Sequence, residues 1–280
     1  VSDKIVSDKI VSDKIVSDFM SFILKPAVGK EFVGRKQILA RLMQELRDKD
    51  STNGFALYGK RRVGKTSILL EARRRLLEEK NIVPIYISVW DLVEWRVSEF
   101  CDKIISETID EYKNRLGIGL KFRELAKLPY DSLTELFKQW ELKAEIGELI
   151  KIVLSKKNEE TSVNKMVEDA FLFPEKMAAK TGTKAVLMID EFPGVTDLIN
   201  GKKIGYGIVG KIRTIHEKYR HTTLCVSGSI AKTMETAVLS PSSAFYGQLT
   251  PIHVEALSLE ETRELVKKNL AGADEETILQ

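Results

Sequence analysis

The chain contains few cysteines and few histidines. Its two cysteines, Cys101 and Cys225, are far apart and lack the Cys-x-x-Cys spacing of metal and redox sites. Neither a disulfide framework nor a zinc site is therefore expected, and a reducing, cytoplasmic setting fits this usage best. The histidines have no metal-ligand spacing with the cysteines; they are His216, His221 and His253.

Long apolar runs and a strong charge of one sign are also missing. The stretch 19–24 is too short to span a bilayer and lacks the layout of a signal peptide, so no membrane association is expected. The 44 Lys and Arg residues nearly balance 41 Asp and Glu residues, which leaves a net charge of +3. This balance gives no broad field for nucleic acid, so nucleic-acid binding would need a further C-terminal domain.

The N-terminus repeats the unit Val-Ser-Asp-Lys-Ile three times, with a decayed fourth copy at 16–20. Five residues advance roughly 140° around an α-helix, so the repeated valines drift around the axis and form no apolar stripe. We therefore expect residues 1–29 to be a flexible leader, with a partner-binding arm as the alternative.

The rest of the chain alternates apolar runs with helical periodicity. Parallel strands need crossover connections, so this alternation predicts an α/β fold in which a five-stranded parallel sheet carries helices on both faces. The expected core spans 30–256 and the start of a helical lid spans 257–280, cut short at Gln280. Strands are expected at 55–58, 82–89, 185–189, 222–226 and 252–256, and helices at 38–46, 67–79, 204–219 and 259–270.

Residues 97–180 show helical periodicity and no convincing strand. We expect a helical insertion here, part of which could serve as a lid. Pro174 would start a further short helix and Gly182 would end one, just before the third strand.

A phosphate-binding pattern follows the first expected strand. The run from Gly59 to Thr66 matches G-x-x-x-x-G-K-[ST] at every fixed position. The two glycines let the backbone fold around phosphates, while Lys65 would contact the β- and γ-phosphates and Thr66 would ligate Mg²⁺. The expected nucleotide-binding residues are Gly59, Lys60, Arg61, Arg62, Val63, Gly64, Lys65, Thr66 and Ser67.

Two acids follow the third expected strand. Asp190 and Glu191 come after a buried apolar run, and ligands of open α/β sheets bind at the carboxyl ends of the strands. Asp190 is therefore expected to hold Mg²⁺, directly or through water. Glu191 would orient or deprotonate the attacking water. A surface acid after a strand is the alternative for this motif taken alone.

The fourth expected strand ends in Ser227-Gly228-Ser229. Ser227 is a candidate catalytic residue that could contact the γ-phosphate or its water. A plain strand-to-helix turn with Ser229 as helix N-cap is equally compatible with the pattern.

These residues together resemble the archaeal-type ATPases of the AAA+/STAND group of P-loop NTPases. The matching pieces lie at 32–35, 58–67, 189–192 and 227–229. The resemblance implies an ATP-binding core of five parallel strands and a helical lid, usually followed by a winged-helix domain. It also implies an adenine pocket at Phe32, Val33, Gly34 and Arg35.

Two positions depart from the family pattern. Family members often carry Glu after the Gly-Arg turn, where this chain has Lys36. They also often show Tyr-Gly-Arg before the last strand, where this chain has Gln248, and a neutral side chain cannot act as an arginine finger. Arg213 and Arg220 are the remaining candidates, although both also fit a solvated helix face.

The leading hypothesis is an Mg-ATP-hydrolysing switch or motor that is slow without a partner and works through a protein partner or self-association. A DNA-directed initiator or remodeller is the first alternative. A small-molecule kinase is the second, although Glu191 beside Asp190 favours water as the acceptor. A nucleotide-binding scaffold that never hydrolyses is the third.

Overall fold

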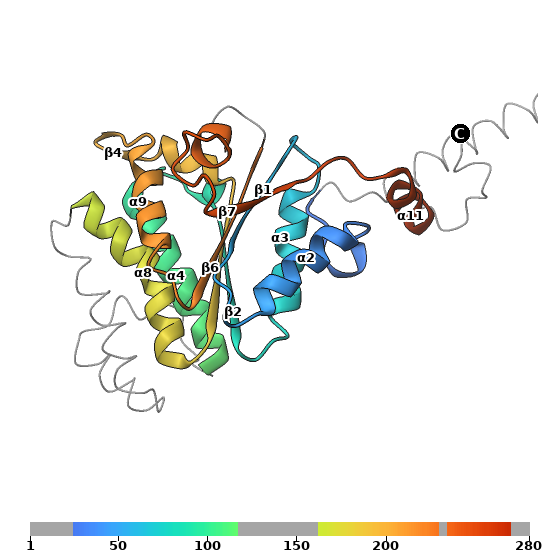
Figure 1. Ribbon diagram of the computed structural model, residues 1–280, viewed down its shortest axis with the longest axis horizontal. Coiled ribbons are helices and arrows are strands. Elements are labelled where there is room, and N and C mark those ends of the chain that lie inside the picture. The colour runs from blue at the N-terminus through green and yellow to red at the C-terminus, as the bar shows by residue number, and fades with distance from the viewer. Residues whose placement is uncertain (1–24, 117–161, 230–233, 270–280) are drawn as a thin grey trace, which may run out of the picture.

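A parallel sheet between two helical layers forms the body of the molecule (Figure 1). The computed structural model describes residues 25–116, 162–229 and 234–269. The strand order is β2-β3-β6-β1-β7, and every neighbouring pair is parallel. The predicted α/β fold with five parallel strands is confirmed. The strands are β1 (Gly54–Gly59), β2 (Ile82–Ser88), β3 (Lys184–Asp190), β6 (Thr222–Ser229) and β7 (Leu249–His253).

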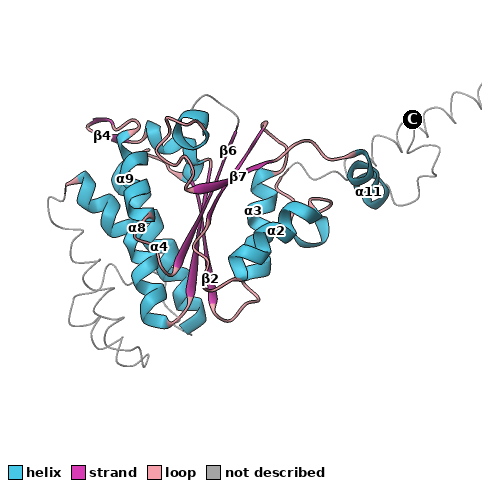
Figure 2. Ribbon diagram, viewed as in Figure 1, coloured by secondary structure: helices cyan, strands magenta, loops and turns pink. Residues whose placement is uncertain are grey.

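Helices cover both faces of this sheet (Figure 2). On one face lie α2 (Lys36–Arg47) and α3 (Lys65–Leu76), and on the other lie α4 (Val97–Leu116), α8 (Val163–Thr181) and α9 (Gly207–His216). The last described helix, α11 (Leu259–Asn269), stands apart from the sheet at the end of the segment after β7 (Figure 1). In the described parts of the chain, no helix has the length and apolar character needed to cross a membrane.

Short elements complete the description. They are the 3-10 turns η1 (Gly29–Glu31), η2 (Val89–Asp91) and η4 (Phe192–Asp197), the π-helical turn η5 (Glu235–Leu239), and a hairpin of β4 (Ile199–Asn200) and β5 (Lys202–Lys203).

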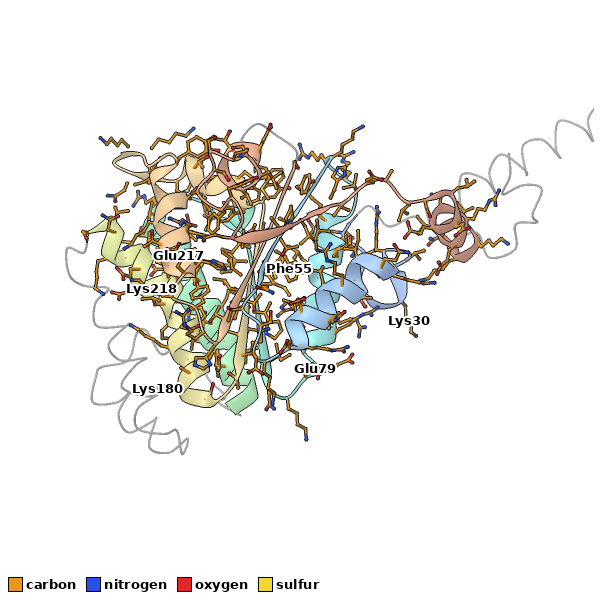
Figure 3. All side chains as sticks on the ribbon, in the orientation of Figure 1. Lys30, Phe55, Glu79, Lys180, Glu217 and Lys218 are labelled. Atoms are coloured by element: carbon orange, nitrogen blue, oxygen red, sulfur yellow. The ribbon has the colours of Figure 1, made fainter. Side chains whose placement is uncertain are left out.

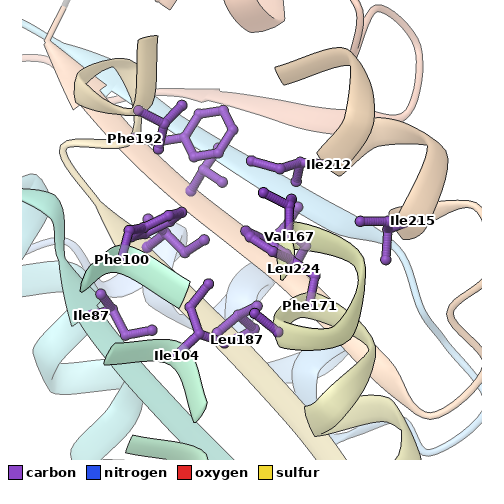
Figure 4. Packing of buried hydrophobic residues seen from close by; sticks show 14 of the residues in the cluster. Ile87, Phe100, Ile104, Val167, Phe171, Leu187, Phe192, Ile212, Ile215 and Leu224 are labelled. Carbon is purple, nitrogen blue, oxygen red and sulfur yellow. The ribbon is translucent and has the colours of Figure 1, made fainter. Parts of the chain in front are cut away.

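The central strands each carry a run of buried apolar residues because helices cover both faces of the sheet. In β3, Leu187 and Ile189 join the core under α4, α8 and α9, whereas Val186 and Met188 join the core under α2 and α3. Figure 4 shows Leu187 among side chains of the first core, from both the sheet and the helices. In Figure 3, Phe55 lies within the body of the molecule and Glu79 lies near its edge. The two cores pack the sheet between the helical layers.

The fifth strand starts earlier than the sequence pattern predicts. It spans Leu249–His253 instead of 252–256, and it pairs with β1 from Gly54↔Leu249 to Tyr58↔His253. The strand contains Pro251, which has no N–H for a ladder. Proline is tolerated there because β7 is an edge strand, and the other edge strand, β2, likewise contains Pro84.

Helix boundaries also differ from the predictions. Pro174 does not start a helix: α8 runs through it to Thr181 and is capped, as expected, by Gly182, whose φ of 65° is the left-handed conformation that glycine favours. The lost backbone hydrogen bond is offset by burial of Phe171, Phe173 and Met177 along the same helix. The helix expected at 204–219 is shorter, Gly207–His216, because it follows Gly205 at a φ of 67°.

The two described ends of the 97–180 segment are helical and pack on the sheet. Phe100 and Ile104 of α4 and Val167 and Phe171 of α8 belong to the same core as the strands (Figure 4). These helices therefore form part of the β2-to-β3 crossover. Several predictions lie outside the described residues: the repeats at 1–20, the middle of the helical insertion at 117–161, and the end of the expected lid segment at 270–280.

Gly54, at the start of β1, leaves no room for a side chain. A Cβ there would lie 2.8 Å from the backbone oxygen of Leu224 and 2.2 Å from Leu249 Cδ2. We expect Gly54→Ala to lower the free energy of unfolding by about 2 kcal/mol, measured by urea denaturation. Gly210→Ala, in α9 with no atom near the added Cβ, should instead raise it by about 0.5–1 kcal/mol. Equal effects of both changes would contradict this packing argument.

Candidate nucleotide site

The segment 59–66, which carries the phosphate-binding pattern and is called the phosphate loop below, connects β1 to α3 at the carboxyl edge of the sheet. Gly59 packs so closely that a Cβ would lie 2.2 Å from the carbonyl oxygen of Val254. Arg62 and Gly64 have positive φ angles of 66° and 95°, which turn the chain back into the first residue of α3, Lys65. A Cβ on Gly64 would meet nothing within 4 Å, so this side of the loop faces open space. The helix N-terminus behind it favours an anion there.

Lys65 is buried at the start of α3 and is held by the loop itself. Its Nζ donates to the carbonyl oxygens of Gly59 at 3.2 Å and Lys60 at 2.9 Å. Burial lowers the pKa of Lys65, and the charges of Glu191 and Asp190 oppose that lowering. The charges of both acids that were expected to act with Lys65 thus act on its ammonium group.

Asp190 ends β3 and accepts hydrogen bonds on both carboxylate oxygens. Oδ2 accepts from Thr66 Oγ1 at 2.7 Å and from the Tyr86 hydroxyl at 3.1 Å. Oδ1 accepts from the backbone N–H of Glu191 at 3.1 Å and from the buried Ser227 hydroxyl. Two predicted metal residues, 124 positions apart in the sequence, are thus direct neighbours.

The donor set at this point fits Mg²⁺. Thr66 and Asp190 offer hard oxygen ligands, and Mg²⁺ is commonly held by one or two such protein groups together with substrate phosphates. Within the described ranges, no group of three or more His, Cys, Asp or Glu side chains could hold a metal by itself.

Glu191 follows Asp190 in a left-handed conformation, with φ of 50°. This turn directs the chain away from the sheet, and Glu191 lines the same cavity as the phosphate loop. Burial raises the pKa of Glu191, as does the charge of Asp190, whereas Lys65 and Arg61 oppose the rise.

The serines at the end of β6 have different surroundings. The Ser227 hydroxyl donates to Asp190 and is fully buried, so it contacts the expected metal-holding carboxylate. Ser229 is the last residue of β6. Its backbone N–H donates to the Glu191 carboxylate, and this hydrogen bond opposes the rise in the pKa of Glu191. Residues 230–233 lie outside the described part of the chain, so the N-cap reading of Ser229 stays a prediction.

A cavity of about 570 Å³ adjoins the loop and joins distant parts of the sequence. Its walls come from the phosphate loop, from Glu191, from the segment before η1 and from α11. The lining residues are Lys25, Pro26, Ala27, Glu31, Arg62, Gly64, Lys65, Thr66, Ser67, Glu191, Leu265 and Asn269.

A second cavity of about 370 Å³ shares part of this wall. It includes three of the four residues of the expected adenine pocket, Phe32, Val33 and Arg35, together with Leu257 and Leu265. Gly34 lies outside its lining, and Lys60 and Arg61 line neither cavity. The Arg61 guanidinium instead lies 5.0 Å from the ring centre of the exposed Trp90, in a cation–π contact.

Arg35 links the phosphate loop to the segment that carries α11. Its guanidinium donates to the carbonyl oxygens of Val63 at 3.0 Å, Glu255 at 2.6 Å and Ala256 at 3.4 Å. Its backbone N–H donates to Glu261 Oε1 at 2.5 Å. Burial lowers the pKa of Arg35, opposed by the charges of Glu261 and Glu255.

Residues 25–29, assigned to the leader by the sequence pattern, instead lie against α3. The backbone N–H of Ala27 donates to Ser67 Oγ at 3.1 Å, and that of Gly29 donates to Glu71 Oε2 at 2.8 Å. Sequence reasoning missed this contact of residues 25–29 with α3. The available signal for it was the i, i+4 spacing of Ser67 and Glu71 on one face of α3. Sequence reasoning also missed Tyr86 and the α11 residues Leu265 and Asn269.

The two candidate arginines are engaged locally. Arg213 pairs with Glu217 at 2.7 Å, and Gln248 donates to the same carboxylate at 2.8 Å. Arg220 donates to the carbonyl oxygens of Glu217 and Tyr219. Their role as an arginine finger stays a prediction.

The sequence of this chain matches a known protein family over most of its length. A model for an ATPase domain predominantly from Archaea matches residues 32–278, a range that runs from Phe32 to beyond α11. The chain belongs to this family. The expected resemblance to archaeal-type ATPases is therefore confirmed, and the archaeal ATPase domain extends over nearly the whole chain. No curated protein sequence matches it.

Solved structures share the fold of this archaeal ATPase domain. The Walker-type ATPase paby2304 of Pyrococcus abyssi has 16% identity and a TM-score of 0.55, over 91% of this chain and 63% of that one. The ORC2 protein of Aeropyrum pernix, in ADPNP and ADP complexes, has 9% identity and a TM-score of 0.54, over 88% and 54%. The ORC1 protein of Aeropyrum pernix, in complex with DNA, has 13% identity and a TM-score of 0.50, over 86% and 50%. The chain thus spans between half and two-thirds of these proteins.

Proposed function

We propose that this archaeal ATPase domain binds Mg-ATP and hydrolyses it with water as the acceptor. The observation that supports this most strongly is the contact of Thr66 with Asp190 beside Lys65 and Glu191, at the edge of a cavity large enough for a nucleotide. The carboxyl end of β3 and the start of α3 converge there, which is the arrangement that phosphoryl transfer requires.

Each side chain has a role in this proposal. Lys65 leaves the loop carbonyls and contacts the β- and γ-phosphates, which stabilises developing negative charge. Thr66 and Asp190 hold Mg²⁺, which when bound neutralises phosphate charge. Glu191 orients the attacking water and accepts its proton; its half-buried position beside Lys65 suits that task.

We further propose that the nucleotide state changes the position of α11. Arg35 contacts both the phosphate loop and the segment before α11, and Leu265 and Asn269 of α11 line the cavity beside Lys65. A triphosphate and its hydrolysis products would interact differently with these groups, and such a difference in affinity is what shifts a conformational equilibrium. The domain would then act as a switch or motor on a protein partner.

A DNA-directed initiator or remodeller is the second candidate. It is favoured by one observation, the fold shared with the ORC1 protein that was solved in complex with DNA. The test is salt-dependent DNA binding by a longer protein that includes a C-terminal domain. No binding at low salt would rule out this candidate.

The phosphate assignment predicts a large effect at Lys65. Lys65→Ala should weaken Mg-ATP binding by about tenfold to a hundredfold, because a charge-assisted hydrogen bond contributes roughly 1.5–3 kcal/mol. Calorimetric titration measures the affinity, and phosphate release without an added acceptor distinguishes hydrolysis from a kinase reaction. Lys49→Ala, on the exposed loop at the opposite end of β1, should behave as wild type. Unchanged ATP affinity in Lys65→Ala would overturn the assignment.

A further inference from the structure

Tyr86 is the one tyrosine that the described hydrogen bonds connect to Asp190. It lies on β2, where it pairs with Met188 of β3, two residues before the pair Ser88↔Asp190. Since strand side chains alternate between faces, Tyr86, Met188 and Asp190 all point toward the α2 and α3 side of the sheet. The Tyr86 ring packs on the core there, and its hydroxyl reaches Asp190 Oδ2 at 3.1 Å.

The hydrogen bonds around Asp190 divide evenly between its oxygens. Oδ1 has the Glu191 N–H and the Ser227 hydroxyl, and Oδ2 has the Thr66 and Tyr86 hydroxyls. Thr66 is itself an expected metal ligand, so its position depends on the metal. The Tyr86 hydroxyl is then the donor to Oδ2 that comes from the sheet itself.

The Tyr86 hydroxyl is a donor to the carboxylate. An ordinary tyrosine phenol, with a pKa of about 10, is protonated across the physiological range, and an ionised carboxylate can only accept, so Tyr86 donates to Asp190 Oδ2. A phenylalanine would fill the same space in the core without that donor.

We propose that Tyr86 is a positioning residue that orients the Asp190 carboxylate for Mg²⁺. The inference rests on the proposed function, because it concerns the metal of the same site. Groups that orient a metal-holding carboxylate typically change metal affinity by about tenfold to a hundredfold when removed. Nucleotide contacts that do not involve the metal should be independent of Tyr86.

The test compares ATP affinity in excess Mg²⁺ with ATP affinity in EDTA, by displacement of a fluorescent ATP analogue. The ratio of the two affinities is the magnesium enhancement. Tyr86→Phe should reduce this enhancement by about tenfold and leave the EDTA affinity within about twofold of wild type. In an Asp190→Asn background, Tyr86→Phe should have no further effect, because the carboxylate that it orients is gone.

A matched control separates this role from simple packing. Tyr219→Phe also removes a phenol hydrogen bond, to the carbonyl oxygen of Phe171 at 2.9 Å, but in the other core. It should lower the thermal midpoint of unfolding and keep the full magnesium enhancement. If Tyr86→Phe does the same, the positioning role is wrong although the proposed function stands. If wild type shows no enhancement by Mg²⁺, the magnesium site itself is wrong, and this inference fails with it.

Discussion

Replacing Glu191 by glutamine should abolish phosphate release while Mg-ATP stays bound. Glutamine has nearly the same size and can keep the left-handed turn after β3, but its neutral amide cannot accept a proton from water. General base catalysis typically contributes 10²–10⁴-fold, so we expect hydrolysis to fall by about that factor. Because Glu191 is not needed to hold the phosphates in the proposed site, the affinity for Mg-ATP should stay within a few-fold of wild type.

Phosphate release and calorimetric ATP titration, run on the same preparations, check this expectation. Size-exclusion analysis in ATP would show whether the trapped complex also changes its association state. Glu79→Gln is a suitable control, because Glu79 pairs with Arg47 beyond the end of α3, away from the phosphate loop. Unchanged phosphate release in Glu191→Gln would remove Glu191 from the mechanism, and loss of ATP binding would assign it to binding instead.

Replacing Glu71 by glutamine should destabilise the fold by about 3 kcal/mol at neutral pH. Glu71 is 1% exposed and accepts hydrogen bonds from Arg74, Arg75 and the backbone N–H of Gly29. Burial alone would raise the pKa of Glu71, but these hydrogen bonds outweigh it and lower the pKa from 4.5 to about 2. A lowering of this size corresponds to about 3 kcal/mol of stability for the ionised form.

The pH dependence gives this prediction its sign. Because the pKa is lower in the folded state, the stabilisation is present in full above about pH 4.5 and is lost as the pH falls toward 2. Urea denaturation should therefore show a large difference between wild type and Glu71→Gln at pH 7 and a much smaller one near pH 2.5. A difference that grows on acidification would contradict the argument.

Glu78 provides the matched control for Glu71. It pairs with the same Arg74, at 2.9 Å, but its side chain is 69% exposed. Solvent screens such a pair, so Glu78→Gln should cost no more than about 0.5 kcal/mol. Comparable losses in the two variants would show that burial is not what makes Glu71 stabilising.

The residues alone were enough to predict the phosphate loop and the class of the sheet. The run 59–66 is contiguous, and its glycines, lysine and threonine are required at set spacings by the backbone turn itself. Strand cores such as 185–189 were predictable because burial on both faces demands an unbroken apolar run. The predicted element boundaries differ from the observed ones where a local signal was ambiguous. Pro251 lies within an edge strand, and Pro174 lies within a helix.

Which distant groups meet depends on how the elements pack and could be seen only in the folded chain. Strand order brings β6 and β2 to either side of β3, so Ser227 and Tyr86 both reach Asp190, a result that no local pattern contains. Two further contacts join residues that are remote in the sequence. Arg35 contacts the segment before α11, and Glu71 contacts Gly29 across the phosphate loop. Periodicity reports which face of an element is buried, whereas the partner across that face depends on how the whole chain packs.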